Sequence, residues 1–174
     1  TKLQYPSGDI IWNMGREPEP NQSNDVTFGH DLGFSYQHSI NLTDTDNILI
    51  FDNGNYSYEF WGQDSTSRAL EIAVSGSAGD YSTDVAFEYI LPVDLHGPES
   101  GNVQKLVNGN YLITTVGNNG TTLEVTPVGE LVWEANYGNN FVYRASRIPP
   151  QCPALGDVNG DGDWNVLDVV TLAN

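Results

Sequence analysis

The sequence predicts an all-β fold, namely a partial β-propeller of repeated four-stranded blades followed by a short calcium-binding loop and helix. Three observations support this prediction. The chain repeats itself, its short segments of β-branched and aromatic residues are bounded by Gly, Asn, Asp and Pro, and no helical pattern of apolar residues precedes Val166.

The repeat consists of two complete copies and one partial copy. Three pairs of segments match between the complete copies: residues 46–51 with 109–114, residues 70–72 with 123–125, and residues 85–88 with 131–134. The partial copy comprises residues 3–5 and 10–12. Repeated sheets that bury their faces only against one another are typical of propeller blades. A β-sandwich is the alternative architecture, and it leaves the repeat unexplained.

Each complete copy is expected to contain four strands. In chain order, these strands end near Leu42 or Val107, follow Asn47 or Asn110, centre on Leu70 or Leu123, and carry Phe87 or Trp133. Residues 48–51 are all apolar, as expected for a strand covered on both faces. The first copy also contains two longer insertions, residues 56–67 and residues 75–83.

Acidic residues dominate the charge of the chain. The 174 residues include 23 Asp and Glu but only 6 Lys and Arg, which gives a formal net charge of −17 at pH 7. This charge repels nucleic acid and anionic lipid, so neither is expected as a partner, and no apolar run is long enough to span a membrane. The composition suits a secreted or extracytoplasmic protein that holds calcium. Cys152 is the only cysteine in the sequence, which therefore allows no disulfide within the chain.

The Pro-rich residues 149–154 are expected to form a stiff linker between a partial propeller, residues 1–148, and a small module, residues 155–174. Within this module, residues 157–168 read DVNGDGDWNVLD, which is the ligand spacing of a 12-residue calcium loop. Six residues are candidate calcium ligands: Asp157, Asn159, Asp161, Asp163, Asn165 and Asp168. The alternative is a polar turn that binds no metal.

With Gly156 before this loop and the apolar residues 166–172 after it, the module resembles one half of the duplicated repeat of a type I dockerin. Asp168 fits this resemblance, because an EF-hand has Glu at the last ligand position. The resemblance implies calcium as the cofactor and a cohesin-like receptor as a partner. Since dockerin-like repeats occur in pairs, the repeat in this chain is expected to be truncated.

A second resemblance runs in order from about Gly8 to Ile148. Its motifs are QHS at residues 37–39, FDNG at 51–54, SRALE at 67–71, GNVQ at 101–104, NGN at 108–110, EVTPVGELVWE at 124–134 and YRASR at 143–147. In these motifs the chain resembles the C-terminal half of arylsulfotransferase-like β-propellers. The resemblance implies a six-bladed propeller facing an extracytoplasmic space, which transfers a sulfuryl group between phenolic compounds through a sulfated histidine.

Three residues of the first complete copy are candidate catalytic residues. Sulfuryl transfer spreads negative charge over peripheral oxygens, so it needs positioned cations, N–H donors and a nucleophile that is neutral near pH 7. We expect His38, at the start of an innermost strand, to act as the nucleophile or as a ligand of the sulfuryl group. Arg68 is expected to stabilise charge, and Asn53 to orient the reacting groups. Each has a structural alternative: a hydrogen-bonded histidine, an arginine paired with a carboxylate, and a turn at residues 52–54.

In the second copy, Gly101 occupies the position of His38, whereas an enzyme of this family is expected to use several channel histidines. The chain by itself is therefore expected to lack sulfotransferase activity. The alternative function is a non-catalytic extracellular propeller that acts as a binding or adhesion module. Because the copies leave unpaired strand edges, a two-fold homodimer is expected to complete a ring of about six blades.

Removal of one ligand tests the calcium loop. We expect calorimetry to detect weak binding of Ca²⁺ by the chain, because every ligand position is filled but the usual partner repeat is missing. Asp157→Ala should abolish the calcium-dependent heat. The absence of such heat in the unaltered chain would contradict the prediction.

Overall fold

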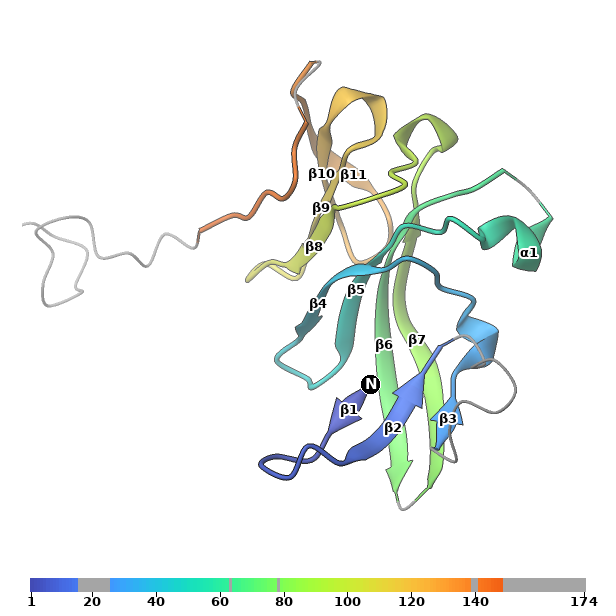
Figure 1. The fold of residues 1–174 in the computed structure, drawn as a ribbon. Helices are drawn as coiled ribbons and strands as arrows, with labels where there is room; N and C mark the ends of the chain where they lie inside the picture. Colours follow the sequence, from blue (N-terminus) through green and yellow to red (C-terminus); the bar gives the residue numbers. More distant parts are fainter. Residues whose placement is uncertain (16–25, 63, 78, 139–140, 149–174) are drawn as a thin grey trace, which may run out of the picture.

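The computed structural model describes residues 1–15, 26–62, 64–77, 79–138 and 141–148 (Figure 1). This part of the chain is all-β with few helices, as predicted, and its strands form one sheet of three strands and two sheets of four. None of its helices is long and apolar enough to cross a membrane. The expected linker and the six candidate calcium ligands, Asp157, Asn159, Asp161, Asp163, Asn165 and Asp168, lie outside the described residues.

The first sheet corresponds to the partial copy of the repeat. In it, β1 (Lys2–Leu3) pairs antiparallel with β2 (Ile10–Met14), and β2 pairs in parallel with β3 (Thr27–Phe28). The 3₁₀ helix η1 (His30–Leu32) then leads into the second sheet.

The two complete copies form two antiparallel sheets whose strands are neighbours in chain order. The second sheet contains β4 (His38–Leu42), β5 (Ile48–Asp52), β6 (Arg68–Ser77) and β7 (Asp80–Ile90). The third sheet contains β8 (Asn102–Lys105), β9 (Tyr111–Thr115), β10 (Thr121–Val125) and β11 (Leu131–Asn136). The prediction of four strands in each copy is confirmed. Closure of such sheets into a propeller ring stays a prediction.

Short helices occupy three further connections. The helix α1 (Ser57–Trp61) lies between β5 and β6, η2 (Val93–Leu95) between β7 and β8, and η3 (Gly117–Asn119) between β9 and β10.

The second insertion of the first copy, residues 75–83, extends β6 and β7 into a long hairpin. This extension carries Tyr81, whose ring stacks on Phe28 at a centroid distance of 5.4 Å and lies 6.4 Å from the ring of Trp12. The extended hairpin therefore covers apolar residues of the first sheet and helps to bury them.

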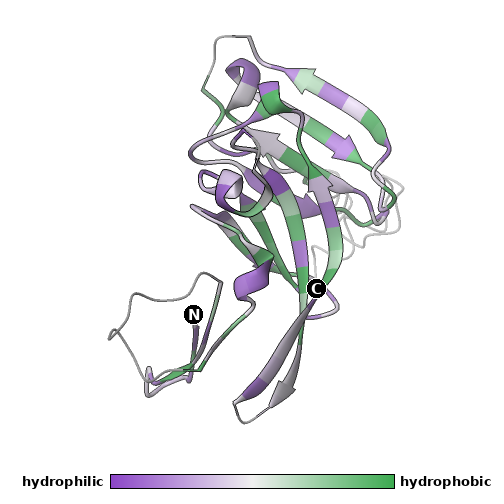
Figure 2. Cartoon of the chain, turned by 90° about the vertical axis from the view of Figure 1, so that its right-hand side faces the viewer, coloured by the Kyte–Doolittle hydropathy of each residue, from purple (hydrophilic) through white to green (hydrophobic). Residues whose placement is uncertain are grey.

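Strand β5 is the centre of the core because both of its faces are covered. All five of its residues are buried. Ile48 and Ile50 belong to a cluster shared with the first sheet, whereas Leu49 and Phe51 belong to a cluster shared with the third sheet. Figure 2 shows hydrophobic residues along the strands in the middle of the molecule. The prediction of a strand that is apolar on both faces is confirmed.

A buried carboxylate joins the first complete copy to the second. Glu71 on β6 accepts a hydrogen bond from Asn47 (2.8 Å) within its own sheet. From the third sheet it accepts hydrogen bonds from the Tyr111 hydroxyl (2.7 Å) and the Lys105 ammonium (3.1 Å to each oxygen). We call this arrangement of asparagine, glutamate and the cation of the following copy the carboxylate clasp.

The second copy repeats the carboxylate clasp. Glu124 on β10 accepts hydrogen bonds from Asn110 (2.8 Å) and from Arg147 of the following segment (2.5 Å). In the partial copy, Gln4 stands at the matching glutamate position and Leu42 at the position of the cation. At these two described positions, neither the carboxylate nor the cation of the clasp is therefore present between the first and second sheets.

Residues 141–148 run beside β8, the first strand of the third sheet. The Asn102 side chain donates to the carbonyl of Ala145 (2.8 Å) and accepts from its N–H (3.0 Å). The Gln104 side chain makes the same pair of bonds with the backbone of Arg147 (3.0 and 2.8 Å). Segment 141–148 therefore contacts its own chain through side-chain amides. The homodimer in which it would complete a blade stays a prediction.

The clasp at Glu71 can be tested by substitution. Burial by itself raises the pKa of Glu71, but hydrogen bonds from Tyr111, Asn47 and Lys105 outweigh burial and hold the pKa below its usual value of 4.5. A carboxylate with a lowered pKa in the folded state stabilises that state above pH 4.5, and the benefit is lost as the pH falls through the folded-state pKa. Glu71→Gln should therefore lower the free energy of unfolding by about 2 kcal/mol at pH 7 and by much less at pH 3.

Urea denaturation at the two pH values measures this effect. Glu134→Gln, on the exposed strand β11, is the matched control and should change the stability by less than about 0.5 kcal/mol. Equal losses for Glu71→Gln at both pH values would contradict an ionic contribution of the clasp.

Candidate functional site

His38 and Asn53 contact each other at one end of the second sheet. His38 begins β4, opposite Phe51 of β5, and Asn53 follows the last residue of β5. The Nδ1 atom of His38 lies 2.7 Å from Oδ1 of Asn53 and 2.9 Å from the carbonyl oxygen of Tyr36. The structure therefore brings together two of the three candidate catalytic residues.

The hydrogen bonds of Asn53 determine which imidazole nitrogen carries the proton. Its Nδ2 atom donates to the carbonyl oxygens of Gly97 (2.7 Å) and Ser100 (3.1 Å), so Oδ1 is the atom that faces His38. Both neighbours of His38 Nδ1 are then acceptors, and Nδ1 must be the donor. In the neutral imidazole this leaves the lone pair on Nε2.

Asn53 is itself held by the residues around it. It is fully buried, and its backbone carbonyl oxygen accepts a hydrogen bond from the Ser67 hydroxyl (2.8 Å). The Ser67 hydroxyl also accepts from the N–H of Gly97 (3.0 Å). Because residues 97–100 lead into β8, the amide of Asn53 is oriented by the start of the third sheet as well as by its own.

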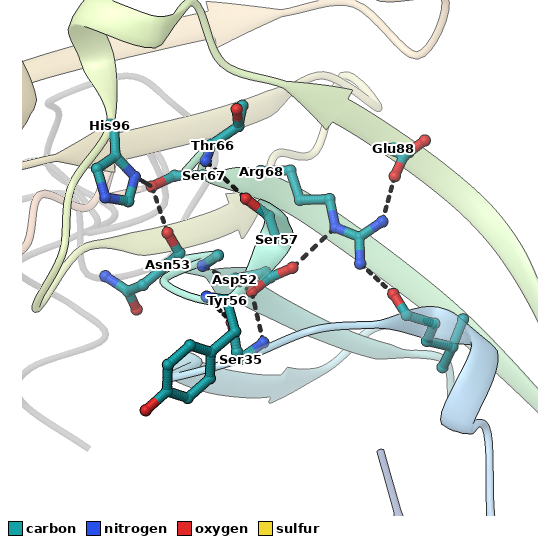
Figure 3. A network of polar contacts seen from close by, with 12 residues as sticks. Ser35, Asp52, Asn53, Tyr56, Ser57, Thr66, Ser67, Arg68, Glu88 and His96 are labelled. Carbon is teal, nitrogen blue, oxygen red and sulfur yellow. Dashed lines mark hydrogen bonds and ion pairs between the residues drawn. The ribbon is translucent and has the colours of Figure 1, made fainter. Parts of the chain in front are cut away.

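Arg68 lies in a different part of this network. It is only 4% exposed, and its Nε atom donates to the Asp52 carboxylate at 2.8 Å. The rest of its guanidinium group donates to Glu88 (2.5 Å) and to the carbonyl oxygen of Leu32. Figure 3 shows the side chains of Arg68 and Asn53 pointing away from each other. The structure thus places Arg68 with carboxylates and not beside His38.

Asp52 connects the two parts of the site. Its carboxylate is fully buried and also accepts from the N–H groups of Ser35 and Gly54, each at 2.9 Å. Burial raises the pKa of Asp52, while the Arg68 charge and these hydrogen bonds oppose that increase. Asp52 therefore fixes the backbone on both sides of the His38 and Asn53 contact. Sequence reasoning treated Asp52 only as part of a turn, since its partners are distant in the chain.

The other two histidines bond to neighbouring groups. Nδ1 of His30 lies 2.6 Å from the carbonyl oxygen of Gly15, and Nδ1 of His96 lies 3.1 Å from the Ser67 hydroxyl. Burial lowers the pKa of His96. Within the described ranges, no group of three or more His, Cys, Asp or Glu residues is arranged to hold a metal ion.

Gly101 explains why the second copy has no counterpart of His38. Its φ is +88°, and a Cβ atom at this position would lie 2.6 Å from the ring of Phe51 and 2.9 Å from the carbonyl oxygen of Thr114. With this backbone, no side chain fits at residue 101.

A groove of about 590 Å³, lined by both polar and apolar residues, lies between β4 and β8. It begins at Ser39, the neighbour of His38, and its lining includes Asn41, Lys105 and Arg144. Lys105 also belongs to the carboxylate clasp, whereas Arg144 lies on segment 141–148 and is exposed. Asp44 also lines the groove, so the groove carries charged residues of both signs close to the candidate site.

One comparison with known proteins identifies a family. A family model described as arylsulfotransferase (ASST) matches residues 4–138, a range that includes both complete copies of the repeat and all three candidate catalytic residues. No curated protein and no solved structure matched the chain.

The buried pair of Asp52 and Arg68 yields a stability prediction. Arg68→Met should lower the free energy of unfolding by about 3–5 kcal/mol, because it leaves the Asp52 carboxylate buried without its cation. The double variant Asp52→Asn/Arg68→Met should recover part of this loss, since Asn keeps an acceptor for Ser35 and Gly54 without a charge.

Chemical denaturation of the two variants and the unaltered chain at pH 7 measures both quantities. A double variant less stable than Arg68→Met would show that the uncompensated carboxylate is not the cause of the loss.

Proposed function

The chain belongs to the arylsulfotransferase family, and from this membership we propose that its His38 site takes part in sulfuryl transfer between phenolic compounds. The contact between His38 Nδ1 and Asn53 Oδ1 carries the proposal. A nucleophilic imidazole must be neutral and must present one bare nitrogen. The hydrogen bonds of Asn53 favour the tautomer in which this nitrogen is Nε2.

Two displacements at sulfur make up the proposed reaction. In the first, Nε2 of His38 attacks the sulfur of an aryl sulfate, the Nε2–S bond forms, and the S–O bond breaks to release a phenolate. In the second, the oxygen of a phenolic acceptor attacks the same sulfur, the Nε2–S bond breaks, and the proton of the acceptor passes to water. Asn53 holds the Nδ1 proton throughout, so the imidazole keeps its orientation in both steps.

The negative charge of the moving sulfuryl group requires donors. Arg68 was expected to stabilise this charge directly, but its contacts to Asp52 and Glu88 support a positioning role that acts through Asp52. Arg144 and Ser39 line the groove beside His38, and we propose that they face the sulfuryl oxygens.

A non-catalytic binding module is the second candidate function. One observation favours it: Arg68, the candidate cation of the site, is buried in ion pairs within the protein. In this alternative, the groove between β4 and β8 binds a sulfated or phenolic ligand without bond cleavage.

We also propose an extracytoplasmic location and a calcium-binding tail, for which the support comes from the sequence. The formal charge of −17 suits a protein outside the cytoplasm, and residues 157–168 carry the ligand spacing of a calcium loop. A cohesin-like receptor is the proposed partner of this tail.

The first displacement can be tested by itself. We expect p-nitrophenyl sulfate to release one equivalent of p-nitrophenolate per chain, and mass spectrometry to locate one added SO₃ group on His38. This is the first displacement alone, with no acceptor present, so it differs from the complete transfer that the chain by itself is expected to lack. Asn53→Leu should slow the release on the order of 100-fold by freeing the tautomer and orientation of His38.

Two histidine variants complete the test. His38→Ala should abolish the release, whereas His30→Gln, which keeps a donor toward Gly15, should not change it. Release that survives in His38→Ala would contradict the proposed nucleophile. Binding of the ester without any release would favour the non-catalytic alternative.

A further inference from the structure

Three tyrosines gather at the same end of the second sheet as His38 and Asn53. Tyr36 precedes β4, while Tyr56 and Tyr58 belong to the connection between β5 and β6 that contains α1. We call these three residues the tyrosine cluster. The hydroxyl oxygens of Tyr36 and Tyr56 lie 3.3 Å apart.

The rings of the cluster are nearly perpendicular to one another. The centroids of Tyr36 and Tyr56 are 5.3 Å apart at an interplanar angle of 72°, and those of Tyr56 and Tyr58 are 6.2 Å apart at 79°. Tyr36 remains 54% exposed and Tyr58 remains 47% exposed. The cluster thus offers aromatic surfaces in different orientations to solvent, where a second flat ring can stack on one and meet the edge of another.

The backbone at Tyr36 is in a conformation that its side chain disfavours. Its φ is +57°, which is in the left-handed region that a bulky residue rarely adopts. Such conformations persist where the surrounding structure enforces them, and they concentrate at functional sites. A glycine would meet the backbone requirement without strain, so the exposed ring at this position calls for a role outside the fold.

The connection that carries Tyr56 and Tyr58 is particular to the first copy. Residues 53–67 join β5 to β6, whereas residues 116–120 suffice for the matching connection between β9 and β10. The insertion therefore adds aromatic residues to the copy that contains His38 and not to the copy that contains Gly101.

The tyrosine cluster is also attached to the candidate site by hydrogen bonds. The carbonyl oxygen of Tyr36 accepts from His38 Nδ1 at 2.9 Å. The N–H of Tyr56 donates to the Ser35 hydroxyl at 3.0 Å, and the N–H of Ser35 donates to Asp52 at 2.9 Å. The tyrosine cluster and the candidate site therefore share one network of hydrogen bonds.

From these observations we propose that the tyrosine cluster binds the flat ring of the phenolic substrate and sets the specificity of the site for its shape. This inference rests on the proposed function. The substrate ring stacks on the exposed tyrosine faces, and its phenolic oxygen bonds to the hydroxyls of Tyr36 and Tyr56. The hydrogen bond between the Tyr36 carbonyl oxygen and His38 Nδ1 then fixes the position of the bound ring relative to Nε2 of His38.

Binding of a phenol alone tests the cluster without any transfer step. Fluorescence titration of the 174-residue chain with 7-hydroxycoumarin should give saturable binding. Tyr56→Leu should raise the Kd roughly 2- to 12-fold, the loss expected for one aromatic pair, and Tyr56→Phe should retain most of the affinity because it keeps the ring. Tyr5→Leu, at an 89% exposed position in the turn between β1 and β2, is the control and should leave the Kd unchanged.

Tyr36→Gly separates recognition from structure. If the ring serves binding, this variant should lose affinity while its melting temperature stays the same or rises, because glycine relieves the strained φ. A lower melting temperature with an unchanged Kd would assign Tyr36 a structural role and overturn the proposal. Displacement of the coumarin by tetramethylammonium would overturn it as well, since it would identify the cluster as a cation site.

The outcome is independent of the reaction at His38. Loss of coumarin affinity in Tyr56→Leu without any phenolate release by the unaltered chain would support the cluster and reject the proposed nucleophile. His38-dependent release together with unchanged coumarin affinity in Tyr56→Leu and Tyr36→Gly would reject the cluster alone.

Discussion

The contact between the second and third sheets depends on a buried glutamate that meets a cation from the next copy. A four-stranded sheet of this size cannot bury both faces by itself, so each copy is stable only against its neighbours. Apolar contact supplies most of the driving force, but it tolerates sliding of one sheet over another. The paired oxygens of Glu71, held by Lys105 and Tyr111, accept only one alignment. We infer that the clasp contributes alignment of the sheets more than net stability, because the desolvation of buried ion pairs opposes their attraction.

The candidate site depends on this alignment. Asn53 is oriented by carbonyl oxygens at Gly97 and Ser100, which lie across the same contact between sheets that Glu71 crosses. Only when the second and third sheets are docked does Asn53 present its oxygen to His38. The protonation pattern of the imidazole is therefore a property of the docked pair of copies and not of one sheet. In a chain with only 6 basic residues, three of them, Arg68, Lys105 and Arg147, are paired with carboxylates of the same chain.

The sequence was most informative where the chemistry is local. The all-apolar run at Ile48 to Phe51 identified a strand covered on both faces, and the repeat located every strand of the two four-stranded sheets. The proximity of His38 and Asn53 followed from their places at the ends of neighbouring strands. The partners of Arg68 could not be inferred in this way, because in an acidic chain many carboxylates compete and only the fold selects Asp52 and Glu88. The tyrosine cluster was hidden for a related reason, since it joins a loop before β4 to an insertion without periodic pattern.

Gly101 has a consequence for how a repeated chain acquires asymmetry. The two copies share their strands and the clasp, yet a missing Cβ at one position lets Phe51 of the first copy pack against the backbone of the second. The same stretch of the second copy, just before Gly101, supplies the carbonyl oxygens that orient Asn53. The second copy thus has no side chain at residue 101, and its backbone forms a packing surface for the first copy. The first copy carries the candidate nucleophile, and the second copy orients the residue that contacts it. A histidine at residue 101 would therefore displace the backbone next to Ser100, whose carbonyl oxygen helps to orient Asn53 toward His38.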